Sequence, residues 1–256
     1  MTFYIVGGFV ALAFALAVLG GALGAWFGTS HKNLCALISL GAGTLLGVTF
    51  FAILPEASGG LNWWELSLAL ASGYVLFAII SKYIYHVCPA CAASHFDEAT
   101  THRFSEIASA MMIALAIHCL ADGIAMAAGR QSQVANAPGG HVLNLSLIVA
   151  ICVHKVPEGL ALGALLLGAG LSRISAVVRV ASVEAATLVG GAAGWLFVPH
   201  VSVTWLDCLV AHVGGGFIFL AAHAVLGEIL KHHKLLVISN FALGVLAIGG
   251  LCLWLR

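Results

Sequence analysis

The stretch that decides the fold runs from residue 142 to residue 169 and reads VLNLSLIVAICVHKVPEGLALGALLLGA. It is long enough to cross a bilayer, because a spanning helix needs about 20 predominantly apolar residues. Three ionisable residues, His154, Lys155 and Glu158, nevertheless lie near its middle. Such groups are costly at bilayer depth and must face one another or a water-filled cavity. The stretch therefore predicts a membrane protein with a polar site inside it.

The composition of the whole chain agrees with this interpretation. Of the 256 residues, 62% are apolar and only 8% are charged, whereas soluble domains have roughly 45–50% and about 25%. We predict an all-α polytopic membrane protein in which residues 1–256 form a single membrane domain. Eight segments are candidate transmembrane helices, at about 3–27, 35–55, 64–85, 105–128, 142–169, 173–197, 202–229 and 236–255. The formal net charge is zero, which gives no case for nucleic-acid binding.

The basic residues predict the orientation of these spans. When the loops are assigned alternately to the two sides of the bilayer, only two of the basic residues in loops and termini, Arg130 and Arg256, fall on one side, and seven fall on the other. Cytoplasmic loops carry the excess of Lys and Arg, so the other side is predicted to be cytoplasmic and both termini to be outside. A short His/Cys loop at about 86–104 is then cytoplasmic. The residues on the cytoplasmic side are Lys32, Lys82, Arg103, Arg173, Arg179, Lys231 and Lys234.

Two short internal matches suggest a repeat. Residues 54–56 (Leu-Pro-Glu) end the second span much as residues 226–228 (Leu-Gly-Glu) end the seventh. Each of these glutamates follows a glycine, Gly43 or Gly215, by 13 residues. The second and seventh spans run in opposite directions in the predicted topology. We therefore predict an inverted repeat of spans 1–3 and 6–8 around spans 4 and 5, a plan common among membrane carriers.

Two neighbouring spans each carry an imidazole and a carboxylate four residues apart. Span 4 contains His118 and Asp122, and span 5 contains His154 and Glu158. Residues i and i+4 lie on one helix face, so each pair can offer two ligands to the same point. Two antiparallel spans can then close a site with two nitrogen and two oxygen ligands, which zinc accepts at about 2.0–2.2 Å. Imidazole also suits iron, nickel and copper, and a polar cluster that only holds the helices together is the simpler alternative.

Glu184, in the middle of span 6, is a further candidate for this site. Together with Asp122 and Glu158 it makes three carboxylates, and Lys155 adds one ammonium, which leaves a net charge of −2 when all four are ionised. A divalent cation would make the site neutral. For Glu184, a plain ion pair with Lys155 remains the alternative to a direct role at the metal.

The motif His-x-x-x-Asp-Gly in span 4, the motif His-Lys-x-Pro-Glu-Gly in span 5 and the mid-span Glu184 resemble the ZIP (Zrt/Irt-like) family of divalent metal transporters. The resemblance covers essentially the whole chain, including the Leu-Pro-Glu end of span 2 and the His/Cys loop after span 3. It implies a membrane transport domain that moves metal towards the cytoplasm. It also implies that the primary ligands are His118, Asp122, His154 and Glu158.

The chain departs from one version of that family at two positions. Some members hold two metals side by side, with Asn in span 4 and an acid after the span-5 histidine, where this chain has Cys119 and Lys155. An ammonium in the second metal position argues for a single metal. We predict that Lys155 pairs with Glu184 and fills that position. Cys119 is either a packing residue or a soft contact to metal in transit.

Several other polar residues are candidates for a metal pathway. Asp207 and His212 lie in the outer half of span 7, with Glu65 at the outer end of span 3, and can form an entrance. His223 and Glu228, in the cytoplasmic half of span 7, can form an exit, although each of these residues can also be an ordinary polar group. The His/Cys loop offers two thiols and two imidazoles that can capture a metal, from His86, Cys88, Cys91 and His95. The alternative is a flexible loop with ordinary thiols.

The sequence thus predicts a carrier of divalent transition metals, with zinc preferred and Fe²⁺, Mn²⁺, Cd²⁺, Ni²⁺ and Co²⁺ as other cargoes. We expect no cofactor, a location in a prokaryotic inner membrane, and the lipid bilayer as the surroundings; a homodimer is left open. One rival is a cation-diffusion exporter, which also pairs His and Asp but usually has six spans and a C-terminal domain. The other is an intramembrane metal hydrolase, for which the His-Glu-x-x-His motif is absent.

Overall fold

The computed structural model describes residues 2–27, 31–83, 112–113, 115–127, 145–197, 200–229 and 234–255. These parts of the chain are almost entirely helical and contain no strand. The elements are α1 (Thr2–Phe27), α2 (His31–Val48), the π-helix η1 (Thr49–Ile53), α3 (Leu54–Ser58), α4 (Trp63–Tyr83), α7 (Leu145–Gly168), α8 (Arg173–Phe197), α9 (Val203–Ile229) and α10 (Lys234–Trp254). A further apolar helix is described from Leu115 to Ala127.

Within the described ranges, seven helical segments are long and apolar enough to cross a membrane. They coincide with seven of the eight predicted spans, and the helix Leu115–Ala127 lies within the remaining one. The all-helical, membrane-spanning character is therefore confirmed. The count of eight spans and the placement of both termini outside stay predictions.

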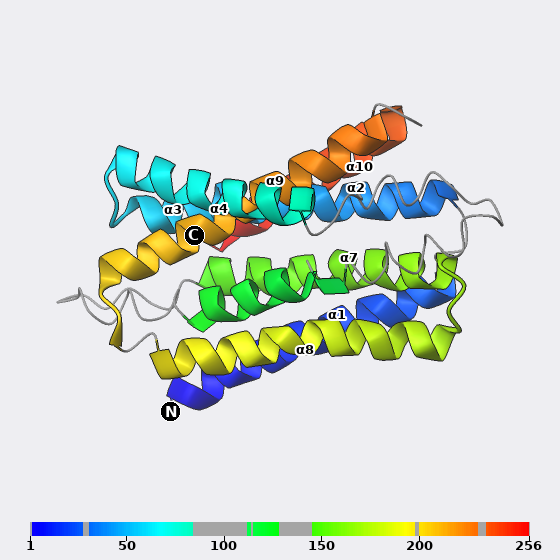
Figure 1. Cartoon of the computed structure of the whole chain (residues 1–256), viewed down its shortest axis with the longest axis horizontal. Helices are drawn as coiled ribbons and strands as arrows, with labels where there is room; N and C mark the ends of the chain where they lie inside the picture. The colour runs from blue at the N-terminus through cyan, green and yellow to red at the C-terminus, as the bar shows by residue number, and fades with distance from the viewer. Residues whose placement is uncertain are drawn as a thin grey trace.

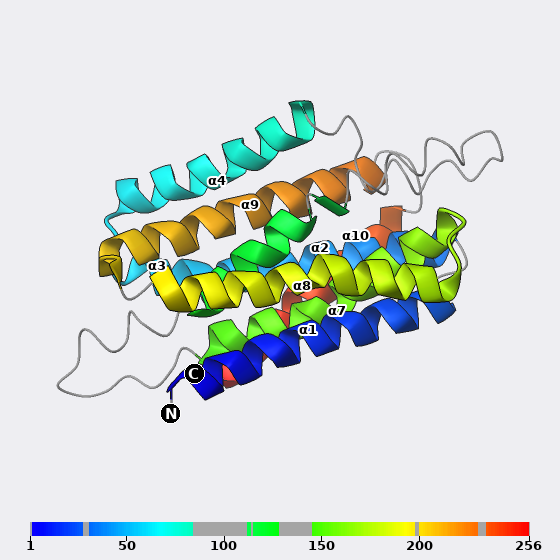
Figure 2. The ribbon, with the colours of Figure 1, turned by 60° about the horizontal axis from the view of Figure 1, so that its bottom comes forward.

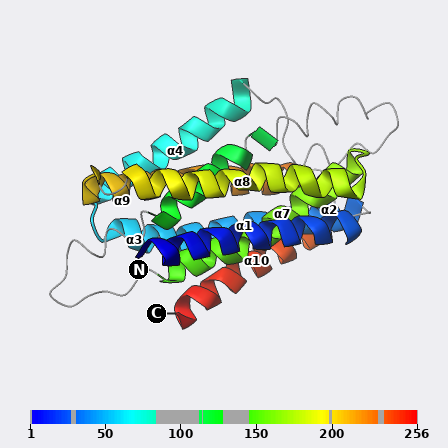
Figure 3. The ribbon, with the colours of Figure 1, turned by 90° about the horizontal axis from the view of Figure 1, so that it is seen from below.

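The helices form two layers that lie side by side (Figure 1). One layer contains α1, α7, α8 and the helix Leu115–Ala127, with α1 packed against both α7 and α8. The other contains α2, α4, α9 and α10, in which α2 packs against α10 and α4 packs along α9. The layers meet where α2 contacts α7. α4 lies at the edge of the bundle (Figures 2 and 3).

Helices α1 and α7 approach so closely that their backbones touch. A Cβ atom on Gly20 of α1 would collide with the carbonyl oxygen of Val156, and one on Gly159 of α7 would collide with the carbonyl oxygen of Ala17. Small residues are the usual means by which membrane helices pack without a hydrophobic driving force between them. This glycine contact fixes the position of α7, the helix that carries the span-5 motif.

The second membrane span is interrupted by η1. In this π turn the Thr49 hydroxyl donates to the Leu45 carbonyl at 3.0 Å. A π turn holds about one residue more than an α turn, which shifts the following helix face by about 100°. The 13-residue spacing from Gly43 to Glu56 crosses this insertion, whereas the same spacing from Gly215 lies wholly inside α9. Equal spacing therefore does not place the two glutamates on equivalent faces, and the inverted repeat stays a prediction.

The α1–α7 contact predicts a large effect of one added methyl group. We expect Gly20→Ala to lower the free energy of unfolding by about 1–3 kcal/mol, because overpacking forces the two backbones apart. Gly7→Ala in the same helix is the control, since nothing lies within 4 Å of its added Cβ. The midpoint of thermal unfolding of the purified protein in detergent measures the difference. Equal midpoints for the two variants would contradict the close contact.

Candidate metal centre

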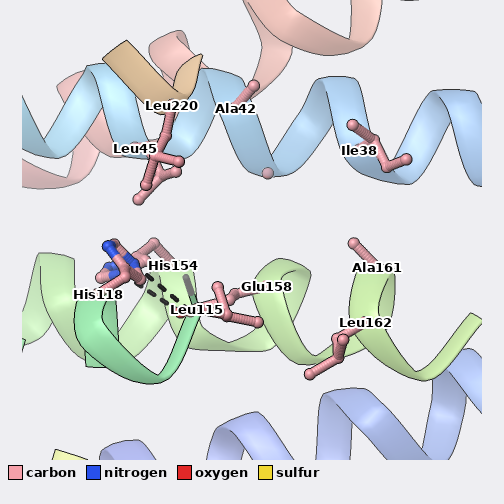
Figure 4. Close-up of a pocket in the computed structure, with 11 residues that line it drawn as sticks. Ile38, Ala42, Leu45, Leu115, His118, His154, Glu158, Ala161, Leu162 and Leu220 are labelled. Atoms are coloured by element: carbon pink, nitrogen blue, oxygen red, sulfur yellow. Dashed lines mark ion pairs between the residues drawn. The ribbon is translucent and has the colours of Figure 1, made fainter. Parts of the chain in front are cut away.

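Two helices bring the four predicted primary ligands to one place. The helix Leu115–Ala127 carries His118 and Asp122, one turn apart, and α7 carries His154 and Glu158 with the same spacing. The side chains of His118, Asp122 and His154 are fully buried, and Glu158 is 9% exposed. Figure 4 shows His118 and His154 side by side, with dashed ion pairs that lead towards Glu158.

The imidazole nitrogens face the carboxylates at nearly equal distances. His118 Nε2 lies 3.4 Å from Asp122 Oδ2 and 3.4 Å from Glu158 Oε1. His154 Nε2 lies 3.4 Å from Asp122 Oδ2 and 3.6 Å from Glu158 Oε2. Two ligands of a tetrahedral zinc ion, each bound at about 2.0–2.1 Å, are about 3.3–3.4 Å apart. The four nitrogen–oxygen separations are therefore close to the separation of two ligands on one zinc ion, and one ligand atom of each residue lies within 4.8 Å of the others.

The imidazole nitrogens that face the carboxylates have no hydrogen-bond partner among the described residues. His154 Nδ1 lies 3.2 Å from the Ala150 carbonyl oxygen. A carbonyl only accepts, so Nδ1 carries the proton and Nε2 keeps its lone pair, the arrangement typical of metal-ligating histidines. In the described part of the chain, three imidazole nitrogens have no hydrogen-bond partner: Nδ1 and Nε2 of His118 and Nε2 of His154. The two Nε2 atoms face the same carboxylates, and unsatisfied buried nitrogens that converge in this way are expected of a ligand set.

The Lys155 side chain lies among three carboxylates, those of Asp122, Glu158 and Glu184. It is fully buried, and Nζ is 2.7 Å from both Asp122 Oδ2 and Glu158 Oε2 and 3.2 Å from Glu184 Oε2. The ion pair with Glu184 is therefore the longest of three. An unpaired ammonium in this environment would cost several kcal/mol, so the three carboxylates compensate its burial.

A second group of ligand-type side chains surrounds the same ammonium. Cys119 Sγ lies 3.5 Å from Glu158 Oε1 and 3.3 Å from Glu184 Oε2, and one donor atom of each residue lies within 4.8 Å of the others. Lys155 Nζ donates to Cys119 Sγ at 3.2 Å. The lysine thus contacts all three members of a group that would otherwise have the composition of a second cation site.

The surroundings of the site differ on its two sides. On one side the Phe217 ring of α9 lies against His118, with 4.6 Å between ring centroids, and belongs to a buried aliphatic cluster that includes Val213 and Ile151. On the other side is a cavity of about 110 Å³. It extends towards the end of the molecule where α2 begins and α7 ends (Figure 4). Its lining includes His118, His154, Glu158, Ile38, Ala42 and Leu162.

Among the described residues, the pathway candidates Asp207, His212 and His223 do not join this buried group. Asp207 is buried on α9. His212 is half-buried on α9 and bonded to Ser72, and His223 is half-buried and stacked on Phe219. Glu228 belongs to α9, but its side chain lies outside the described residues, as do His86, Cys88, Cys91 and His95 in full.

The contact of Phe217 with both histidines was not predicted from the sequence. Its ring also lies 6.0 Å from that of His154. One aromatic residue within an apolar span carries no signal that distinguishes it from others facing lipid or the helix core. Only the packing of α9 against the site reveals it.

Membrane-length helices around a buried set of two imidazoles and two carboxylates define an integral membrane protein whose interior holds a group that could bind a metal ion. Residues 90–253 match the ZIP zinc transporter family. The match covers more than half of the chain, and the chain therefore belongs to this family of transmembrane metal transporters. A comparison with curated proteins found no match.

The position of Lys155 predicts a change in metal stoichiometry. We expect Lys155→Ala to raise bound zinc from about one to about two ions per chain, because Cys119, Glu158 and Glu184 then form a vacant three-ligand site. Elemental analysis of protein equilibrated with zinc and freed of excess metal measures the ratio. Lys234→Ala, which removes an exposed lysine on α10, is the control. An unchanged ratio in a folded Lys155→Ala protein would show that the ammonium does not fill a second metal position.

Proposed function

We propose that this protein carries Zn²⁺ towards the cytoplasm through a single intramembrane site formed by His118, Asp122, His154 and Glu158. The observation that carries the proposal is the set of four nitrogen–oxygen distances, 3.4, 3.4, 3.4 and 3.6 Å, which are close to the separation of two ligands on one zinc ion. Membership of the ZIP family supports metal ion transport. The zinc preference, the single site and the direction are the parts that we add.

Charge supports a divalent cargo. The Lys155 ammonium contacts all three carboxylates, and the four groups carry a charge of −2 when all are ionised. A dication neutralises this charge, whereas a monovalent ion would leave half of it exposed to low-dielectric surroundings. Fe²⁺, Mn²⁺, Cd²⁺, Ni²⁺ and Co²⁺ have the same charge, and the mixed nitrogen–oxygen ligand set also accepts them. We therefore assign them as competing cargoes.

The geometry also supports a path through the site. The four ligands replace the water that the ion loses, and the cavity beside them supplies a way out between α2 and α7. In the predicted topology this cavity faces the cytoplasm, so the ion would leave inward. We assign Asp207 and His212 to the approach and His223 and Glu228 to the exit. Glu184 acts on the metal indirectly, by holding Lys155.

Zinc uptake into proteoliposomes loaded with a fluorescent zinc indicator tests the proposal. We expect saturable uptake in the wild type and a loss of at least about tenfold in His154→Ala, because a four-ligand site loses one of its nitrogens. His200→Ala, which removes an exposed histidine, is the matched control and should retain uptake. Equal uptake by the two variants would show that the zinc pathway does not depend on the His154 site on α7.

The same vesicles separate the rival functions. A cation-diffusion exporter would take zinc up into vesicles in which its cytoplasmic face points outward, whereas a carrier that works towards the cytoplasm would take zinc up when that face points inward, so the orientation of the inserted protein decides between them. An intramembrane hydrolase would cleave a peptide or lipid substrate without metal flux. Membership of a transporter family weighs against both.

A further inference from the structure

A second set of side chains of metal-ligand type lies in a groove between α4 and α9. Helix α4 lies along α9 at the edge of the bundle (Figures 2 and 3). The groove is lined by Glu65 and Ser72 of α4 and by Cys208 and His212 of α9. It shares no residue with the central group. The indoles of Trp64 and Trp205 flank it, 52% and 72% exposed, and exposed Trp side chains mark the level of the membrane–water interface. Ions in water can therefore reach this groove.

The hydrogen bonds of Ser72 determine which nitrogen of His212 is free. The Ser72 hydroxyl donates its one hydrogen to the Ala69 carbonyl at 2.7 Å, and Oγ lies 2.8 Å from His212 Nδ1. Since that hydrogen is already used, Oγ must accept from Nδ1–H. The Nε2 atom of His212 therefore keeps its lone pair. A ring nitrogen that donates to a fixed oxygen while the other stays free is the arrangement of a metal-ligating histidine.

Cys208 and Glu65 supply two more donors to the same groove. Cys208 lies four residues before His212 on α9, so the two side chains share one helix face. Among the described cysteines it is the one that is not buried. Glu65 accepts a hydrogen bond from the Asn62 backbone N–H at its Oε2 atom, at 2.9 Å. This bond fixes the carboxylate at the start of α4, next to the groove, and leaves Oε1 for a ligand.

We propose that Cys208, His212 and Glu65 form a peripheral site for a soft divalent cation, Zn²⁺ or Cd²⁺. Thiolate and imidazole favour these ions over Mg²⁺ or Ca²⁺, and three protein ligands with one water complete a tetrahedron. On binding, the Cys208 S–H bond breaks, the proton passes to water, and a metal–sulfur bond forms without any change of oxidation state. The three donor atoms do not all lie within 4.8 Å of one another in the described chain, so the half-buried side chains close on the ion by rotation.

The reactivity of Cys208 towards a maleimide tests the site without relying on transport. The background is Cys88→Ser with Cys91→Ser, which leaves Cys208 as the reactive thiol because Cys35, Cys119, Cys152 and Cys252 are buried. Cd²⁺ at about ten times its dissociation constant should slow labelling by about tenfold, since only the unoccupied fraction reacts. Adding Cys208→Ser to the background gives the residual labelling to subtract.

Matched variants decide whether the ion is held by the proposed set. His212→Ala should abolish the protection, and Ser72→Ala should weaken it while the imidazole remains. His223→Ala, on the same helix but outside the groove, should leave it unchanged. Asp122→Asn should also leave it unchanged, which separates this site from the proposed transport site. Absence of protection, or full protection in a folded His212→Ala protein, would overturn the proposal.

Discussion

Asp122, Glu158 and Glu184 lie inside a membrane bundle, where burial removes most of their hydration, and one ammonium contacts all three. Each isolated charge would cost several kcal/mol in such surroundings. The short acidic side chains reach the lysine only if their helices are very close. On the α8 side, a Cβ atom on Gly123 would collide with the Thr187 carbonyl oxygen. The glycine contacts of this layer and its buried charges therefore depend on each other.

Much of the candidate site could be predicted because its geometry is local. His118 and Asp122, like His154 and Glu158, are one turn apart on their own helices, and an ionisable residue within an apolar span has few explanations. The contacts of Lys155 were harder. We predicted its pair with Glu184, but the contacts with Asp122 and Glu158 are shorter. Glu158 follows Lys155 by three residues on α7, so that contact lies within one helix. The contact with Asp122 depends on how two helices pack, and no spacing in the sequence encodes that packing.

The membrane spans were predictable for a similar reason, since length and hydropathy belong to each segment alone. The predicted segment 3–27 and helix α1 (Thr2–Phe27) differ by one residue. The π turn Thr49–Ile53 was not predicted, because one extra residue in a turn leaves the hydropathy of the span unchanged. The pairing of α1 with α7 is also a property of the packed bundle. Glycines at several positions of α1 look alike in sequence, yet Gly20 faces α7 while Gly7 faces open space.

The buried lysine also has an electrical consequence for the proposed transport cycle. With all four groups ionised, the loaded site is neutral and the empty site carries two negative charges. A membrane potential acts on moving charge with about 2.3 kcal/mol per elementary charge per 100 mV. If the site crosses the membrane together with its ion, voltage leaves the movement of the loaded site unaffected and acts on the return of the empty site. A negative cell interior repels that site outward, so the resting potential of a cell would reset the carrier after each delivery.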